Sequence, residues 1–172
     1  DYMIAENKNC KNIIDKFISD LKKNMLPKGK KQNNDTSFYF PRLYTELNGL
    51  INWDWNILDI EKFIRAFSTP YPGAYSYIKG NKIFILDVEV EKKKCFHPFL
   101  NGKIITVLKN GNVRVACGEG SLIITSLNLM GDTIKPAEIL KINSTFESPL
   151  IELVKSKMTI PKTSEMKPHK NK

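Results

Sequence analysis

The sequence has little of two features that mark specialised classes of protein, long apolar runs and an apolar N-terminal leader. None of its 172 residues lies in a run that approaches 18 uncharged apolar positions, and Asp1-Tyr2-Met3 is soon followed by polar residues. A membrane-spanning helix needs about 20 apolar residues, and a signal peptide needs an apolar core near its start. We therefore expect a cytoplasmic chain without a membrane partner.

Cysteine and histidine are also scarce. Cys10, Cys95 and Cys117 are odd in number and form no C-x-x-C pair, which favours free thiols in a reducing compartment over a disulfide framework or a zinc site. His97 falls where the pattern predicts a connection between strands, and His169 stands alone near the end. No Gly-rich phosphate loop occurs. The sequence thus predicts no catalytic residue, no metal and no cofactor site of its own.

Positive charge is concentrated at the two ends of the chain. The net charge is +9 at pH 7, with eight Lys against four acidic residues in 1–32 and six Lys against one Glu in 155–172. Residues 33–154 are neutral in sum. Lys-rich ends are typical of solvated surfaces, whereas a protein that follows nucleic-acid phosphates usually gathers Arg and Lys on a folded face. The central residues therefore give little support to nucleic-acid binding.

An amphipathic helix is predicted over about residues 6–24, followed by a polar linker over 25–37. The apolar positions recur at i, i+1, i+4, i+5 and i+8 and are Ile13, Ile14, Phe17, Ile18 and Leu21. Asn24, Pro27 and Gly29 end the helix. Because the linker separates this stripe from the rest of the chain, we expect its packing partner upstream of Asp1.

The remainder predicts one helix and several short strands. A stripe at Ile57, Ile60, Phe63, Ile64 and Phe67 indicates a helix that Asn56 or Asp59 caps. Strands are predicted at 75–78, 82–90, 102–108, 112–117 and 121–127, with short helices near 136–141 and 149–157 and a disordered tail after 158. The fold class is α+β: an N-terminal helix and extended linker, then a small OB-like open β-barrel with one or two short helices.

Several aromatic and aliphatic side chains are candidates for the core. Trp53 and Trp55 are two apart, so a regular strand would place both rings on one buried face. Phe84, Val88 and Val90 alternate as core residues of a strand would, and no face that combines basic and aromatic residues stands out.

Two further residues have structural interpretations. Gly73, after Pro70 and Pro72, is expected to turn the chain where a side chain would clash. Arg65 is expected to form an ion pair with Asp54 or Glu61 rather than to bind phosphate.

A family resemblance rests on four motifs. They are Ile51-Asn52-Trp53-Asp54, Ile64-Arg65-Ala66-Phe67, Tyr71-Pro72-Gly73-Ala74 and the later hairpin Val115-Ala116-Cys117-Gly118-Glu119-Gly120-Ser121-Leu122. In order and spacing they cover most of residues 37–142 and resemble the C-terminal domain of methionyl-tRNA formyltransferase and its relatives. The helix and linker before them resemble the end of the family's Rossmann-like catalytic domain.

The resemblance implies that this chain is the C-terminal portion of such an enzyme. Residues 1–24 would be the last helix of an absent catalytic domain, 25–50 a linker, 51–158 the C-terminal barrel and 159–172 a basic tail. The family's catalytic Asn, His and Asp lie in the other half, so the fragment is expected to be inactive alone. The full-length enzyme would use 10-formyltetrahydrofolate, and the fragment would bind none. The implied partner is that catalytic domain, and a homodimer stays open.

The formyl acceptor divides the family between methionyl-tRNA and nucleotide-linked amino sugars. Three features favour the sugar N-formyltransferase branch. The charge of residues 33–154 is neutral in sum. The other two features are sequences that resemble this branch, the Tyr-Phe-Pro-Arg stretch within 37–43 and Phe96-His97-Pro98-Phe99. The linker of such enzymes runs beside the active site, so Phe40 and Arg42 are the candidate substrate-binding residues, Arg42 through a bidentate phosphate contact. An Arg that ties the linker to the domain surface explains the same residue.

Two other classes of function remain open. The chain could be a non-catalytic barrel that binds nucleic acid or an acidic partner, as barrels of this size do through exposed aromatic and basic residues. It could also be the product of a broken gene with no function of its own.

Overall fold

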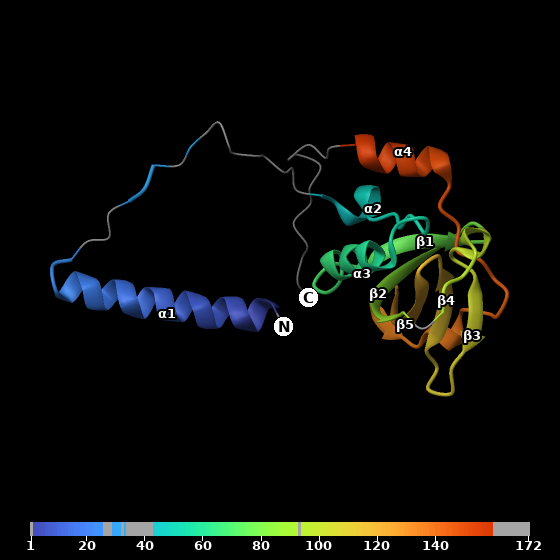
Figure 1. Ribbon diagram of the computed structural model, residues 1–172, viewed down its shortest axis with the longest axis horizontal. Helices are drawn as coiled ribbons and strands as arrows, with labels where there is room; N and C mark the ends of the chain where they lie inside the picture. Colours follow the sequence, from blue (N-terminus) through green and yellow to red (C-terminus); the bar gives the residue numbers. More distant parts are fainter. Residues whose placement is uncertain (1, 26–28, 32, 34–42, 93, 160–172) are drawn as a thin grey trace. The chain divides into compact units, whose positions relative to one another are not determined.

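The structure, a computed structural model, describes residues 2–25, 29–31, 33, 43–92 and 94–159. The chain divides into two compact units, residues 1–40 and 41–172 (Figure 1). The predicted site residues Phe40 and Arg42 and the predicted tail after residue 159 lie outside the described residues. Each unit is described by itself.

The described residues of the first unit form one helix, α1 (Tyr2–Lys22), which begins four residues before the predicted start. Its apolar stripe is exposed: Ile13 is 67% accessible and Leu21 is 42% accessible. Asn24 ends the helix in the left-handed conformation at φ 54°, and its N–H donates to the Leu21 carbonyl. Asn tolerates this conformation better than most residues, which explains why the helix ends there.

The second unit is built on one antiparallel sheet. The strands are β1 (Ala74–Ile78), β2 (Asn81–Glu91), β3 (Ile104–Val107), β4 (Val113–Cys117), β5 (Gly120–Leu129) and β6 (Asp132–Ile134). Their order is β1-β2-β5-β4-β3, and β6 pairs with β5. Five of these strands were predicted. The short β6 was not, because three residues are too few to show an alternating pattern.

Residues 143–147 join the two ends of the sheet. On one side the N–H of Asn143 donates to the Ile104 carbonyl, and the N–H of Phe146 donates to the Gly102 carbonyl. On the other side Tyr77 and Glu147 exchange both backbone hydrogen bonds. Because β1 and β3 are the outer strands of the order, this segment supplies a partner to both edges, and the sheet closes on itself.

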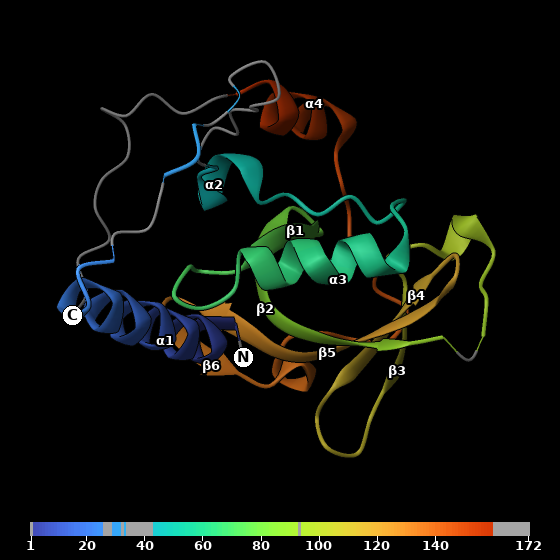
Figure 2. The same cartoon turned by 60° about the vertical axis from the view of Figure 1, so that its left-hand side comes forward.

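One helix covers the core of the closed sheet. Helix α3 (Ile57–Ala66) lies across the strands (Figure 2), and it is capped as predicted by Asn56, whose side chain accepts a hydrogen bond from the Leu58 N–H. Ile60 and Ile64 are fully buried against the sheet. Two 3-10 turns, η2 (Pro98–Leu100) and η3 (Pro136–Glu138), complete the connections.

The prediction for the two tryptophans is half right. Trp53 is 3% accessible, stacks on Phe146 at 4.8 Å between ring centroids, and donates from Nε1 to Ser76 Oγ. Trp55 is partly exposed and packs edge-on against Phe63 at 5.1 Å. The two rings part because residues 52–55 form a turn, not a strand, so the period of two does not apply.

The prediction for Phe84 is wrong, and a bulge explains why. The pairing of β2 with β5 shifts between Ile85 and Val88, so the strand's core-facing positions change from odd to even residues. Ile85 and Val88 both pack in the main core. Phe84 lies on the opposite face, in a second cluster with Tyr75.

Gly73 has the close backbone contact that the sequence predicts. Its φ is 109°, and a Cβ there would lie 2.7 Å from the Ile85 carbonyl oxygen. Gly80, in the β1–β2 turn, has φ 78° but nothing within 4 Å of a Cβ. A side chain at Gly80 would therefore meet only the strain of a positive φ, whereas a side chain at Gly73 would also clash with β2.

Replacement of Gly73 by Ala should lower the free energy of unfolding by more than the same change at Gly80. We expect about 1 kcal/mol at Gly80 from the positive φ alone, and roughly 2 kcal/mol more at Gly73, where a strand must also shift. Urea unfolding of both variants measures the difference. Equal losses would show that β2 moves aside at no cost.

Candidate functional site

The second unit starts, among the described residues, at Leu43. This position directly follows Phe40 and Arg42, the predicted substrate-binding residues. Leu43 is half exposed, and the short helix α2 (Thr45–Asn48) follows. Helix α4 (Leu150–Met158), far along the sequence, lies beside α2 (Figure 1). The point where the chain enters the second unit is therefore fixed by α4.

Asn48 holds this junction together. Its side chain is 6% exposed, and Nδ2 donates to the carbonyl oxygens of Ser156 at 2.7 Å and Thr159 at 2.9 Å. Its Oδ1 accepts from the Tyr44 N–H at 2.9 Å. The last carbonyls of a helix have no partner within the helix, so an amide that donates to them satisfies groups that would otherwise be unpaired.

A cleft of about 280 Å³ lies beside this amide. Its lining comes from residues 43–63 and from α4 and its end, and consists of Leu43, Asn48, Leu50, Trp55, Phe63, Leu153, Ser156, Lys157 and Thr159. The lining is mainly apolar, and Lys157 is its one titratable side chain. Such a cleft can hold an apolar group beside a few hydrogen-bonding atoms, but it offers no acid or base pair for catalysis.

Replacement of Asn48 by Asp should detach α4. The carboxylate keeps the oxygen that accepts from Tyr44 but loses both donated hydrogen bonds and faces two carbonyl oxygens instead. We expect a loss of about 2 kcal/mol in unfolding free energy and faster amide hydrogen exchange in α4.

The same substitution at Asn81, exposed at the start of β2, is the matched control and should change neither quantity appreciably. Unchanged exchange in α4 of the Asn48 variant would show that apolar packing alone holds the helix.

A lysine lies among aromatic rings on the other side of α4, which corrects the expectation that no basic and aromatic residues gather on one face. Lys82 Nζ is 3.9 Å from the centroid of the Tyr75 ring and within 6 Å of the Tyr77 and Phe84 rings. Glu152 accepts a hydrogen bond from the Tyr77 hydroxyl at 2.7 Å. Cross-strand pairing brings these residues together, since Tyr77 is opposite Lys82 and Tyr75 is opposite Phe84.

These phenols are not available as bases. Burial raises the pKa of both Tyr75 and Tyr77, and the neighbouring Glu152 carboxylate raises them further. Tyr75, Tyr77, Lys82 and Glu152 line a hollow of about 290 Å³, and Glu46 and Lys155 also line it. Two carboxylates therefore offset two ammonium groups, and this surface lacks the positive excess that phosphate-tracking proteins use.

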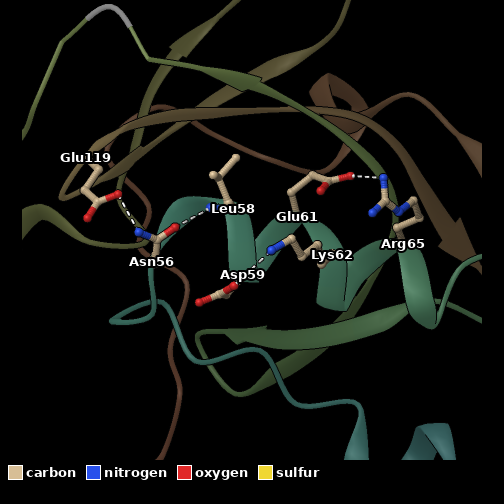
Figure 3. Close-up of polar contacts among 7 residues, drawn as sticks. All are labelled: Asn56, Leu58, Asp59, Glu61, Lys62, Arg65 and Glu119. Carbon is tan, nitrogen blue, oxygen red and sulfur yellow. Dashed lines mark hydrogen bonds and ion pairs between the residues drawn. The ribbon is translucent and has the colours of Figure 1, made fainter.

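The polar face of α3 carries paired charges (Figure 3). Arg65 lies 3.1 Å from Glu61, the predicted type of pair, and Lys62 lies 3.5 Å from Asp59. Asn56 also donates to Glu119 at 2.6 Å, which ties the start of α3 to the β4–β5 turn. Surface pairs of this kind contribute little to stability, about 0–1 kcal/mol each. Arg65 is therefore engaged within its own helix.

His97 has a local structural role in the connection after β2. His97 accepts a hydrogen bond from the Phe99 N–H through Nδ1 and so caps η2, as a residue in a connection would. Among the described residues, His, Cys, Asp and Glu form no group of three or more that could hold a metal ion. No helix in the described ranges is long and apolar enough to cross a membrane.

The three cysteines should differ sharply in reactivity. Cys10 and Cys95 are exposed, whereas Cys117 is buried and its burial raises its pKa to about 12. A thiol reacts as the thiolate, so Cys117 stays protonated and inert below about that pH in the folded protein. Alkylation at pH 8, followed by mass spectrometry, should modify two cysteines quickly and the third only in denaturant. Fast modification of Cys117 would contradict its place in the core.

The second unit belongs to the class of small antiparallel β domains that carry helices on their surface. Residues 44–144 match the family described as the formyl transferase C-terminal domain. The match spans more than half of the chain and contains all four motifs on which the resemblance rests. The chain belongs to this formyltransferase family.

Curated relatives carry the same assignment. The methionyl-tRNA formyltransferase of Geobacter metallireducens is 36% identical over 118 residues, which are 69% of this chain and 35% of that protein. The methionyl-tRNA formyltransferase of Pseudoalteromonas translucida is 32% identical over 111 residues, 63% of this chain and 34% of that protein. The chain thus spans about a third of the length of these relatives.

Solved structures show the same fold. HypX variants from Aquifex aeolicus superpose with a TM-score of 0.52 at 16% identity, over 74% of this chain and 22% of theirs. HypX in complex with tetrahydrofolic acid superposes with a TM-score of 0.51 at the same identity. At this identity the likeness concerns the fold alone, a mixed helical and antiparallel structure similar to the formyltransferase C-terminal domain.

Proposed function

We propose that this chain is the C-terminal part of a 10-formyltetrahydrofolate-dependent N-formyltransferase. The observation that carries the proposal is the family match over residues 44–144, within a chain that spans about a third of its curated relatives. Formyl transfer needs a group that deprotonates the amine and donors for the tetrahedral oxyanion. Neither cleft beside α4 provides such a set, so folate and catalysis belong to another part of the enzyme.

The proposed organisation keeps the predicted boundaries, with the last part of the linker, from residue 43, packed into the second unit beside α4. Residues 1–24 are the last helix of a catalytic domain, 25–50 are the linker, 51–158 are an OB-like barrel and 159–172 are a basic tail. The closure of the sheet by residues 143–147 supports the barrel. The enzyme acts in the cytoplasm, and the catalytic domain is the partner of this unit, in a monomer or in a homodimer.

The proposed formyl acceptor is the amine of a nucleotide-linked amino sugar, bound with the help of Phe40 and Arg42. Charge supports this choice, because residues 33–154 are neutral in sum and the solvent face of β2 carries the exposed Asp87 and Glu89. An acidic strand face repels a polyanion such as tRNA.

Methionyl-tRNA is the alternative acceptor, and a specific observation favours it. Both curated relatives reported above are methionyl-tRNA formyltransferases, at 32% and 36% identity. The Lys-rich ends of the chain would then supply the phosphate contacts that the barrel lacks.

A formyl-transfer assay tests which acceptor the enzyme uses. The assay takes the full-length protein that is encoded by the reading frame containing this chain. We expect turnover with nucleotide-linked amino sugars and at least a hundredfold lower kcat/KM with methionyl-tRNA. Substitution of Arg42 by Gln should raise the KM for the sugar, because a phosphate contact is lost, while KM for the folate stays unchanged.

Binding of tRNA by the 172-residue chain is the accompanying control. We expect only salt-sensitive, non-specific affinity, on the order of 10⁻⁴–10⁻⁶ M at physiological salt. Efficient formylation of methionyl-tRNA would move the assignment to that acceptor, and the absence of formyl transfer to any amine would overturn the enzyme assignment itself.

A further inference from the structure

A hollow of about 330 Å³ opens on the outer face of the barrel, at the end of β2. It lies apart from both clefts beside α4 and draws its lining from β2, β3, β4, β5 and the segment after β2. The volume falls within the range of sites that hold small molecules, about 300–1,000 Å³. None of its residues has a part in the proposed formyl transfer.

An ion pair forms one wall of this hollow. Arg114 Nε lies 2.9 Å from Glu91 Oε2, and its Nη2 donates to Glu91 Oε1 at 3.3 Å. Ser121, directly opposite Glu91 in the sheet, donates to the same carboxylate from Oγ at 3.0 Å. Both charged side chains are about three-quarters buried, at 27% and 23% accessibility. The ion pair and the single hydrogen bond from Nη2 hold the guanidinium group beside Glu91.

A tight backbone contact supports the position of Glu91. Gly120, at the start of β5, approaches the Glu91 carbonyl so closely that a Cβ there would lie 2.5 Å from its oxygen. Any other residue at 120 would push the end of β2 away. The local backbone thus specifies where the ion pair sits.

A bulge in β3 shapes the opposite wall. Ile104 pairs with Val115 and Thr106 with Arg114, so Ile105 is the extra residue of β3. Ile105 and Thr106 consequently both line the hollow, which neighbours on a regular strand would not do. Bulges often re-aim side chains next to binding sites.

The remaining two lining residues are an aromatic ring and a lysine. Phe96 is half buried, and Lys94 is exposed two residues before it. The charges of Glu91 and Arg114 cancel, so the net charge of the lining is +1, from Lys94. The hollow therefore favours an anion whose body is flat and partly apolar.

We propose that this hollow binds a single nucleoside 5′-phosphate, with the base against Phe96 and the guanidinium plane of Arg114 and the phosphate at Lys94. Aromatic rings and guanidinium planes both stack on nucleobases, and Thr106 provides a hydroxyl for a polar group of the ligand. The site takes one nucleotide unit, not an extended strand, because exposed Asp87 and Glu89 precede Glu91 on the same strand face and repel further phosphates.

The test is titration of the isotope-labelled 172-residue chain with uridine and adenosine 5′-monophosphates, followed by backbone amide chemical shifts. We expect saturable shifts centred on residues 91–96, 105–106, 114 and 121. Uridine, which lacks the phosphate, and ribose 5-phosphate, which lacks the base, should each bind at least fivefold more weakly. Inorganic phosphate alone should give no saturation in the same concentration range.

Two matched pairs of variants test the assigned residues. Phe96→Leu keeps an apolar group but removes the ring, and it should weaken binding roughly tenfold, within the range for loss of one base stack. Phe99→Leu is its control, since Phe99 is 89% exposed and lies outside the lining. Lys94→Gln should abolish the preference for the monophosphate over uridine, while Lys92→Gln, outside the lining, should keep it.

Three results would overturn the proposal: no saturation with either monophosphate, saturating shifts that centre elsewhere, or equal effects of the Phe96 and Phe99 variants. Tighter binding of hexauridylate than of the mononucleotide, by tenfold or more and with a steep loss on added salt, would overturn the single-unit assignment. None of these readouts requires formyl transfer, so the proposal can fail while the formyltransferase assignment stands, and the reverse also holds.

Discussion

The second unit depends on the backbone pairing of residues 143–147 with the two outer strands of the sheet. Without this segment, β3 would present an unpaired edge and β1 would keep only its bridge to Leu50, and unpaired edges are prone to association. Phe146 anchors the segment by stacking on Trp53. The indole N–H of Trp53 donates to Ser76 Oγ, and this hydroxyl donates to the Glu147 carbonyl. One aromatic pair and one short hydrogen-bond chain therefore hold the closing segment in register.

Closure also determines where the candidate sites lie. Directly after the closing segment, Ser148 donates to the Ile51 carbonyl, and α4 begins at Leu150. The helix is thereby brought back beside α2, where Asn48 can reach its last carbonyls. The two clefts beside α4 thus exist because the sheet closes, although their lining residues lie about 100 positions apart in the sequence.

The regular parts of this fold could be predicted from the sequence because burial follows a period there. Alternation identified five strands, the stripe of α3 identified its buried face, and Asn56 signalled its start. The shifts at Ile85–Val88 and at Ile105 could not be predicted, because a bulge moves one residue without changing the local composition. Phe84 was assigned to the wrong face for this reason, and the hollow beside Thr106 left no signal at all.

Sites that cross strands are harder still to read from sequence. Lys82 contacts the tyrosines of the neighbouring strand, and Arg114 contacts Glu91 across β5, so these contacts join residues 5 to 23 positions apart. Phe40 and Arg42, by contrast, came from the family resemblance and lie outside the described residues. For this chain, periodicity predicted the scaffold, and resemblance predicted the family.

The neutrality of the central residues acquires a physical meaning once the pairs are known. Glu91 is offset by Arg114, Glu61 by Arg65 and Asp59 by Lys62, so part of the charge counted in 33–154 cancels locally. A surface organised as local pairs presents short-range fields that decay within a Debye length, about 8–10 Å at physiological salt. Under the proposed function, such a surface favours recognition of a small anion in a hollow, where screening is weak, over attraction of a long polyanion from a distance. This local pairing supports the proposed choice of a compact acceptor, whereas the alternative acceptor, methionyl-tRNA, would depend on the basic ends of the chain.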